Sequence, residues 1–121
     1  MGFITWRLQD VFLQVGVKSA DYTAGSDSGP DSDEFIPVHT LDGPVTITLP
    51  SIAARPRVQT FLIGDFTGHC GTHNIIIQPH PDDAVGAVPL PGVADVIDNP
   101  FATRPMRGVD GGALGRRWMY F

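Results

Sequence analysis

Three side chains that could bind a metal ion stand close together in the sequence, at His69, Cys70 and His73, with His80 a short distance beyond. Zinc accepts imidazole nitrogen and thiolate sulfur, but a structural site usually needs roughly four such ligands and a catalytic site roughly three plus a water. Cys70 is the single cysteine of the chain, and His39 could help only if the fold brings it near. We therefore expect a polar turn without a metal, with His69, Cys70 and His73 as the candidates if one is bound.

The same residues suggest a thiol nucleophile, because a histidine beside Cys70 could act as its base. Catalytic partners usually meet in space from distant segments, and an oxyanion hole must also be present. Neighbours in sequence are weak support for such a pair. The expectation is a partly buried thiol beside two turn histidines, no catalytic residue, no cofactor and no enzyme activity.

An acidic segment over residues 21–34 carries Asp27, Asp31, Asp33 and Glu34 among serines and glycines. Its spacing resembles a calcium loop only in part, because the turn glycine and the distant bidentate glutamate of an EF-hand are missing. Asp82-Asp83 could also suggest calcium, an ion that takes roughly six to eight oxygen ligands. The segment is therefore expected to be a solvated acidic loop or arm.

Positive charge is concentrated near the C-terminal end of the chain, where four arginines lie. Acidic and basic segments of one chain suit contact between neighbouring subunits, where complementarity sets the register. The alternative is that these charges serve only solubility. The aromatic residue at position 121 is a further interface candidate, since an unsupported terminal side chain would fray. The predicted interface residues are Asp31, Asp33, Glu34, Arg104, Arg107, Arg116, Arg117 and Phe121.

Short strands separated by turns are the elements that must position these residues. Residues 45–49 alternate strictly, so Val45, Ile47 and Leu49 should face a core while Thr46 and Thr48 face away. Residues 5–18 favour a strand, with a helix as the competing interpretation. Beyond residue 81 the chain is rich in Pro, Gly and Asp, and no internal repeat is visible. The predicted strands are 35–41, 45–49, 57–63, 74–78 and 116–121.

The chain has 121 residues with 14 glycines and 11 prolines, which fits one β-domain over residues 1–121 and interrupts any long helix. Its formal net charge is −5, and no basic run is present, so nucleic acid and membrane surfaces are not expected as partners. Residues 1–9 show no basic segment followed by an apolar one. A lone cysteine also suits a reducing compartment, so synthesis in the cytoplasm is expected.

The order of three segments resembles a pattern of phage fibre, spike and head-decoration proteins. These segments are a Val-Thr-Ile-Thr-Leu-Pro strand over 45–50, a strand with a turn over 61–65, and Asn-Ile-Ile-Ile-Gln-Pro over 74–79. In that family a turn similar to Asp83-Ala84-Val85-Gly86 often follows, here one residue shorter, and a tryptophan such as Trp118 lies near the final strand. The resemblance covers about the central third of the chain and two later points.

The resemblance implies an all-β single domain, a sandwich or jelly-roll-like barrel, that assembles as a homotrimer on a virion surface. No heptads or collagen-like repeats are present to build a shaft, which favours a capsid decoration or head-spike protein contacting the major capsid or fibre protein. The expected location is the virion surface, after synthesis in the host cytoplasm. A receptor- or carbohydrate-binding fibre tip is the first alternative, and a small metal- or thiol-dependent enzyme is the second.

Overall fold

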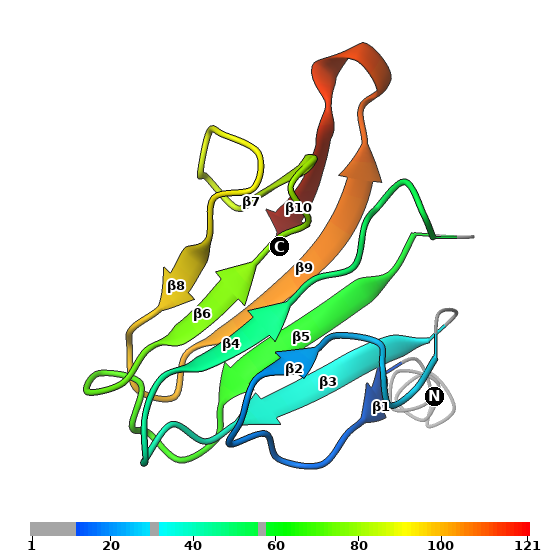
Figure 1. Ribbon diagram of the computed structural model, residues 1–121. Coiled ribbons are helices and arrows are strands. Elements are labelled where there is room, and N and C mark those ends of the chain that lie inside the picture. The colour runs from blue at the N-terminus through cyan, green and yellow to red at the C-terminus, as the bar shows by residue number, and fades with distance from the viewer. Residues whose placement is uncertain (1–11, 30–31, 56–57) are drawn as a thin grey trace, which may run out of the picture.

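The protein folds as two β-sheets packed face to face, as the computed structural model shows for residues 12–29, 32–55 and 58–121 (Figure 1). The expected all-β sandwich is confirmed. Among these residues the only helix is one short 3-10 turn, η1 (Gly112–Leu114). The strands are β1 (Phe12–Gln14), β2 (Tyr22–Thr23), β3 (Asp33–Val38), β4 (Val45–Thr48), β5 (Thr60–Asp65), β6 (Ile75–Gln78), β7 (Asp83–Val85), β8 (Asp95–Ile97), β9 (Thr103–Asp110) and β10 (Arg116–Tyr120).

Successive strands alternate between the two sheets over most of the chain. Strands β1, β3 and β5 are parallel neighbours in the larger sheet, and β2, β4 and β6 are parallel neighbours in the smaller one. The chain thus winds like a short two-sheet solenoid, in which each turn adds one strand to each sheet. Val45 lies beside Ile75 and Ile47 beside Ile77, so the fold contains a structural repeat that the sequence does not reveal.

The parallel winding stops after β6. Strand β8 runs antiparallel to β6, β9 runs antiparallel to β5, and β9 and β10 form a hairpin. Strand β7 then pairs in parallel with β10, which gives the larger sheet the order β1-β3-β5-β9-β10-β7 and the smaller sheet the order β2-β4-β6-β8 (Figure 1). The C-terminal hairpin therefore completes the larger sheet beyond the last turn of the winding.

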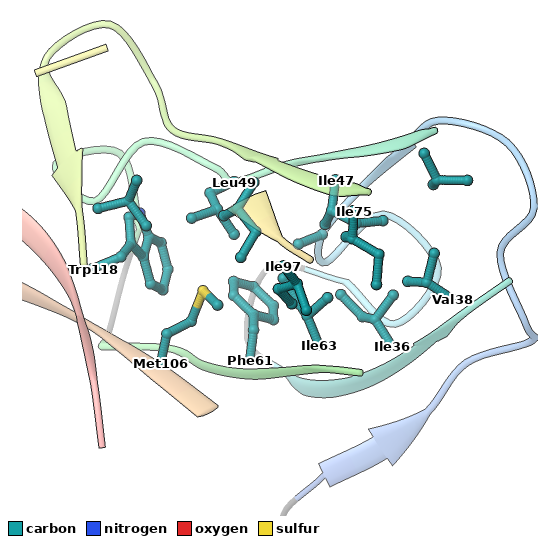
Figure 2. Close-up of a cluster of buried hydrophobic side chains, with 14 of the residues drawn as sticks. Ile36, Val38, Ile47, Leu49, Phe61, Ile63, Ile75, Ile97, Met106 and Trp118 are labelled. Carbon is teal, nitrogen blue, oxygen red and sulfur yellow. The ribbon is translucent and has the colours of Figure 1, made fainter. Parts of the chain in front are cut away.

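Apolar side chains from both sheets fill the space between them (Figure 2). The predicted alternation is confirmed, because Val45, Ile47 and Leu49 are buried while Thr46 and Thr48 are only half-buried. Towards β10 the core becomes aromatic, where the rings of Phe61 and Trp118 lie 5.3 Å apart between centroids. The largest buried apolar side chains are Trp118, Phe61, Ile36, Ile47, Leu49, Ile63, Ile75, Ile77, Ile97 and Met106.

The prediction of a solvated acidic arm over residues 21–34 is wrong for much of that segment. Strand β2 lies within it, and Asp33 and Glu34 are buried at the start of β3. A carboxylate can be buried where donors surround it, and this arrangement is not encoded in local composition. Asp31 lies outside the described residues.

The remaining strand predictions agree with the structure except at their boundaries. The predicted strand 35–41 is β3, which begins earlier and ends at Val38, and the predicted strand 57–63 is β5, displaced towards Asp65. Of the N-terminal stretch, the part that is described contains only the short β1. The longest strand, β9, was not predicted, because Pro105 and Gly108 interrupt its pattern. Within the described ranges no helix is long and apolar enough to span a membrane.

Candidate functional site

The histidines of the candidate metal cluster do not converge on one point. The imidazoles of His39 and His69 both contact the Thr67 hydroxyl through Nδ1, at 2.6 and 2.9 Å, and their rings meet edge to face. His80 instead lies beside Asp82, with its Nδ1 accepting the Asp82 amide proton. In the part of the chain that is described, no three metal-ligating side chains form a group that could hold a metal ion.

Cys70 belongs to the core and not to an exposed reactive site. Its thiol is fully buried and donates to the carbonyl oxygen of Ile97 at 2.6 Å. Burial raises the pKa of the Cys70 thiol, and the nearby Asp65 carboxylate acts in the same direction. A thiol that resists ionisation is a poor nucleophile. The cysteine that the sequence predicted to be partly buried is in fact fully buried in the core.

The loop around Cys70 is organised by the buried carboxylate of Asp65, at the end of β5. Its oxygens accept backbone N–H groups from Gly68 at 3.2 Å, Cys70 at 3.2 Å and Phe101 at 2.9 Å. Two loops that are distant in sequence are thus joined at one side chain. The histidine-cysteine segment is an ordered turn with a structural role.

Glu34 has a comparable role in the segment that was expected to be mobile. Its fully buried carboxylate accepts hydrogen bonds from the Tyr22 hydroxyl, the Gly25 amide at 2.7 Å, and both the amide and the hydroxyl of Ser28. Asp33 accepts the Thr60 amide at 2.9 Å. Neither acid is available to pair with a neighbouring subunit, so this part of the predicted charged interface is wrong.

Most of the interface arginines are engaged within the chain. Arg116 pairs with Asp110 at 3.3 Å, and Arg117 donates to the carbonyl oxygens of two residues between β7 and β8, at 2.9 and 2.6 Å. Arg104 lies over the Tyr120 ring, 5.9 Å from its centroid. Arg107 donates to the Thr60 hydroxyl at 3.3 Å and remains exposed on the outer face of β9.

Arg107 and Phe121 do come together, on an exposed groove that we call the hairpin face. Its volume is about 310 Å³. The exposed fractions of its apolar side chains are 70% for Phe121, 50% for Met119 and 39% for Val109. Alternate residues of β9 and β10 point outward here, opposite the buried Met106 and Trp118. The hairpin face is lined by Arg107, Val109, Met119, Tyr120 and Phe121.

A second hollow, of about 250 Å³, lies at the end of the sandwich beside Trp118 and was not anticipated from the sequence. We call it the Trp118 cavity. It brings together the loop after β4, the two residues that precede β5, and the hairpin of β9 and β10. No local sequence signal marks it, because its walls are far apart in the chain. They are formed by Ile52, Ala53, Arg55, Val58, Gln59, Gly108, Asp110 and Trp118.

Comparison of the sequence with known proteins assigns no family to this chain. No protein-family model matches the chain, and no curated protein matches its sequence.

Proposed function

We propose that this chain is a non-enzymatic structural β-domain of a bacteriophage or phage-like particle, most consistent with a capsid decoration or head-spike protein. Its partners are further copies of itself, as a homotrimer, and the major capsid or fibre protein of the particle. The hairpin face is the contact surface. The trimer and the position on the virion come from the resemblance of residues 45–50, 61–65 and 74–79 to such proteins.

The choice of the hairpin face as the contact surface rests on one observation. Val109, Met119 and Phe121 are exposed side by side on one face of the sheet. A row of large apolar side chains left in water is typical of an interaction surface, whereas isolated ones are normal. Arg107 at the same groove adds a cation that can pair with a partner's carboxylate or carbonyl. Apolar burial with one charged contact suits a subunit interface.

The segments that carry the resemblance also form one compact unit. Strand β4 lies beside β6 in the smaller sheet, and β5 occupies the centre of the larger sheet between β3 and β9. Their order in sequence therefore corresponds to successive turns of the winding. This arrangement is a sandwich on which the C-terminal hairpin is displayed.

Analytical ultracentrifugation of the full chain at micromolar concentration tests the association. The wild type is expected to sediment as a trimer, and the double variant Met119→Ser, Phe121→Ser as a monomer. Leu90→Ser is the matched control, because Leu90 is 64% exposed but lies outside the groove. A monomeric wild type, or a double variant that associates like the control, would contradict the contact surface.

The salt dependence of the trimer's dissociation distinguishes an apolar contact from a charged one. Since Asp33 and Glu34 are buried and Arg116 and Arg117 are engaged within the chain, only weak dissociation is expected between low and high salt. The place on the particle requires a map of the native virion. Density for this sandwich on the capsid surface supports the proposal, and density at a fibre tip would instead favour the receptor-binding alternative.

A further inference from the structure

The Trp118 cavity has apolar walls held apart by a glycine. Gly108 of β9 pairs directly with Trp118 of β10. A Cβ atom at Gly108 would lie 3.1 Å from Ile52 Cγ1 and 3.4 Å from the six-membered ring of Trp118, so any larger residue would intrude on the space between these side chains. At about 250 Å³ the cavity is slightly smaller than the roughly 300 to 1,000 Å³ typical of drug-sized ligand sites. It suits a ligand of about one ring.

The cavity wall also includes a buried polar side chain whose bonding capacity is only partly used. Gln59 is buried, and its side-chain Nε2 donates to the Ser32 carbonyl oxygen at 2.8 Å, which orients the amide. Its other amide atom, Oε1, is buried and has no hydrogen-bond partner among the described residues. A buried acceptor left unpaired loses its hydration without compensation, so a native structure that retains one calls for an explanation.

The other polar side chain of interest is Arg55, which is half-buried in the same wall. Among the described residues no carboxylate pairs with it, although the cavity wall includes Asp110. The Asp110 carboxylate is occupied by Arg116 and by the backbone N–H of Gly112. The cavity therefore presents one arginine that has no carboxylate partner among the described residues, on walls that are mostly apolar.

We propose that the Trp118 cavity binds a small organic carboxylate, about one ring in size, with an apolar face. The carboxylate accepts hydrogen bonds from the guanidinium of Arg55, whose planar fork matches that geometry. The apolar face packs against Ile52, Val58 and the edge of Trp118, and the oriented side chain of Gln59 closes the wall beside them. Both an aromatic acid and a sugar acid offer this chemistry. The proposal is independent of the hairpin face and of the particle.

The test is an NMR titration of the full chain with benzoate and with glucuronate, beside their uncharged counterparts benzamide and methyl glucoside. At least one acid is expected to give saturable shifts of the Gly108 amide, the Gln59 side-chain amide and the Trp118 indole N–H. The uncharged counterpart should bind at least about tenfold more weakly. Which acid binds distinguishes the aromatic from the sugar source.

Two variants and one control locate the binding. Arg55→Gln should weaken the affinity at least about tenfold, which corresponds to about 1.4 kcal/mol. Gly108→Ala should weaken it by filling the space, without a change in charge. Arg104→Gln, another arginine on the hairpin but outside the cavity wall, should have no effect. Each variant is first shown to unfold cooperatively near the wild-type temperature.

Three results would overturn the proposal. The first is the absence of saturable shifts at the cavity with either acid at millimolar concentration. The second is equal affinity for an acid and its uncharged counterpart, and the third is an affinity unchanged by both Arg55→Gln and Gly108→Ala. If only one of the two variants is too unstable to measure, the other decides.

Discussion

Replacing Glu34 by glutamine should destabilise the protein strongly although the two side chains have nearly the same shape. The carboxylate of Glu34 is fully buried and surrounded by donors from Tyr22, Gly25 and Ser28. Glutamine replaces one acceptor oxygen with an NH₂ group, which points a donor at donors. A hydrogen bond to a charged group contributes about 1.5 to 3 kcal/mol, and a buried donor left unpaired costs about 1 to 3 kcal/mol. We therefore expect a loss of about 2 to 5 kcal/mol for Glu34→Gln.

Urea denaturation followed by circular dichroism measures this loss as a change in the free energy of unfolding. Asp27→Asn is the matched control in the same segment, because the side chain of Asp27 is 51% exposed and, among the described residues, forms an ion pair only with Lys18. An exposed ion pair contributes at most about 1 kcal/mol. If Glu34→Gln costs no more than Asp27→Asn, Glu34 does not organise the segment as described here. In hydrogen exchange, a loss of amide protection confined to residues 22–28 in Glu34→Gln would show that the hydrogen bonds to Glu34 stabilise this segment.

Three further results are expected. Ile47→Ala should cost about 2 to 5 kcal/mol of unfolding free energy in urea, against under about 1 kcal/mol for Thr46→Ala, because only Ile47 is fully buried. Cys70 should react slowly with a thiol reagent at about pH 8 in the native protein and rapidly in urea, since burial raises its pKa; equal rates would place the thiol at the surface. Burial, and then the hydrogen bond to Asp95, raise the pKa of Tyr120. The contribution of Tyr120 to stability is therefore complete below its unfolded pKa of about 10 and is lost as the pH rises through the higher folded value. Tyr120→Phe should flatten the alkaline part of a plot of unfolding free energy against pH.

The alternation in residues 45–49 and the isoleucine run in residues 74–78 predicted their strands correctly, and the alternation also predicted which side chains of residues 45–49 are buried. Local alternation is enough for this, because side chains of a strand point to opposite faces wherever the strand lies in a sheet. The same reasoning missed β9, where Pro105 and Gly108 break the pattern. Those residues are tolerated because β5 and β10 flank β9 and because the Trp118 ring lies beside Gly108. Such compensation comes from other segments and cannot be read locally.

The acidic residues show the same contrast between what the local sequence predicts and what the tertiary structure decides. In sequence Glu34 and Asp27 look alike, two acids among serines and glycines, yet one is fully buried and the other is exposed. The difference arises from β2 and β3 lying in opposite sheets, which closes the segment between them over Glu34. Composition alone could only predict an acidic loop.

The sequence by itself therefore determined the all-β class, the short strands and which side chains of β4 face the core, because these depend on the properties of neighbouring residues. Only the tertiary structure decided the alternating parallel winding, the burial of Glu34 and Cys70, the hairpin face and the Trp118 cavity. Each of these joins residues far apart in the chain, such as Arg55 with Asp110 or Arg107 with Phe121. Contacts of that kind depend on strand order and register, which are set by the packing of the whole sandwich.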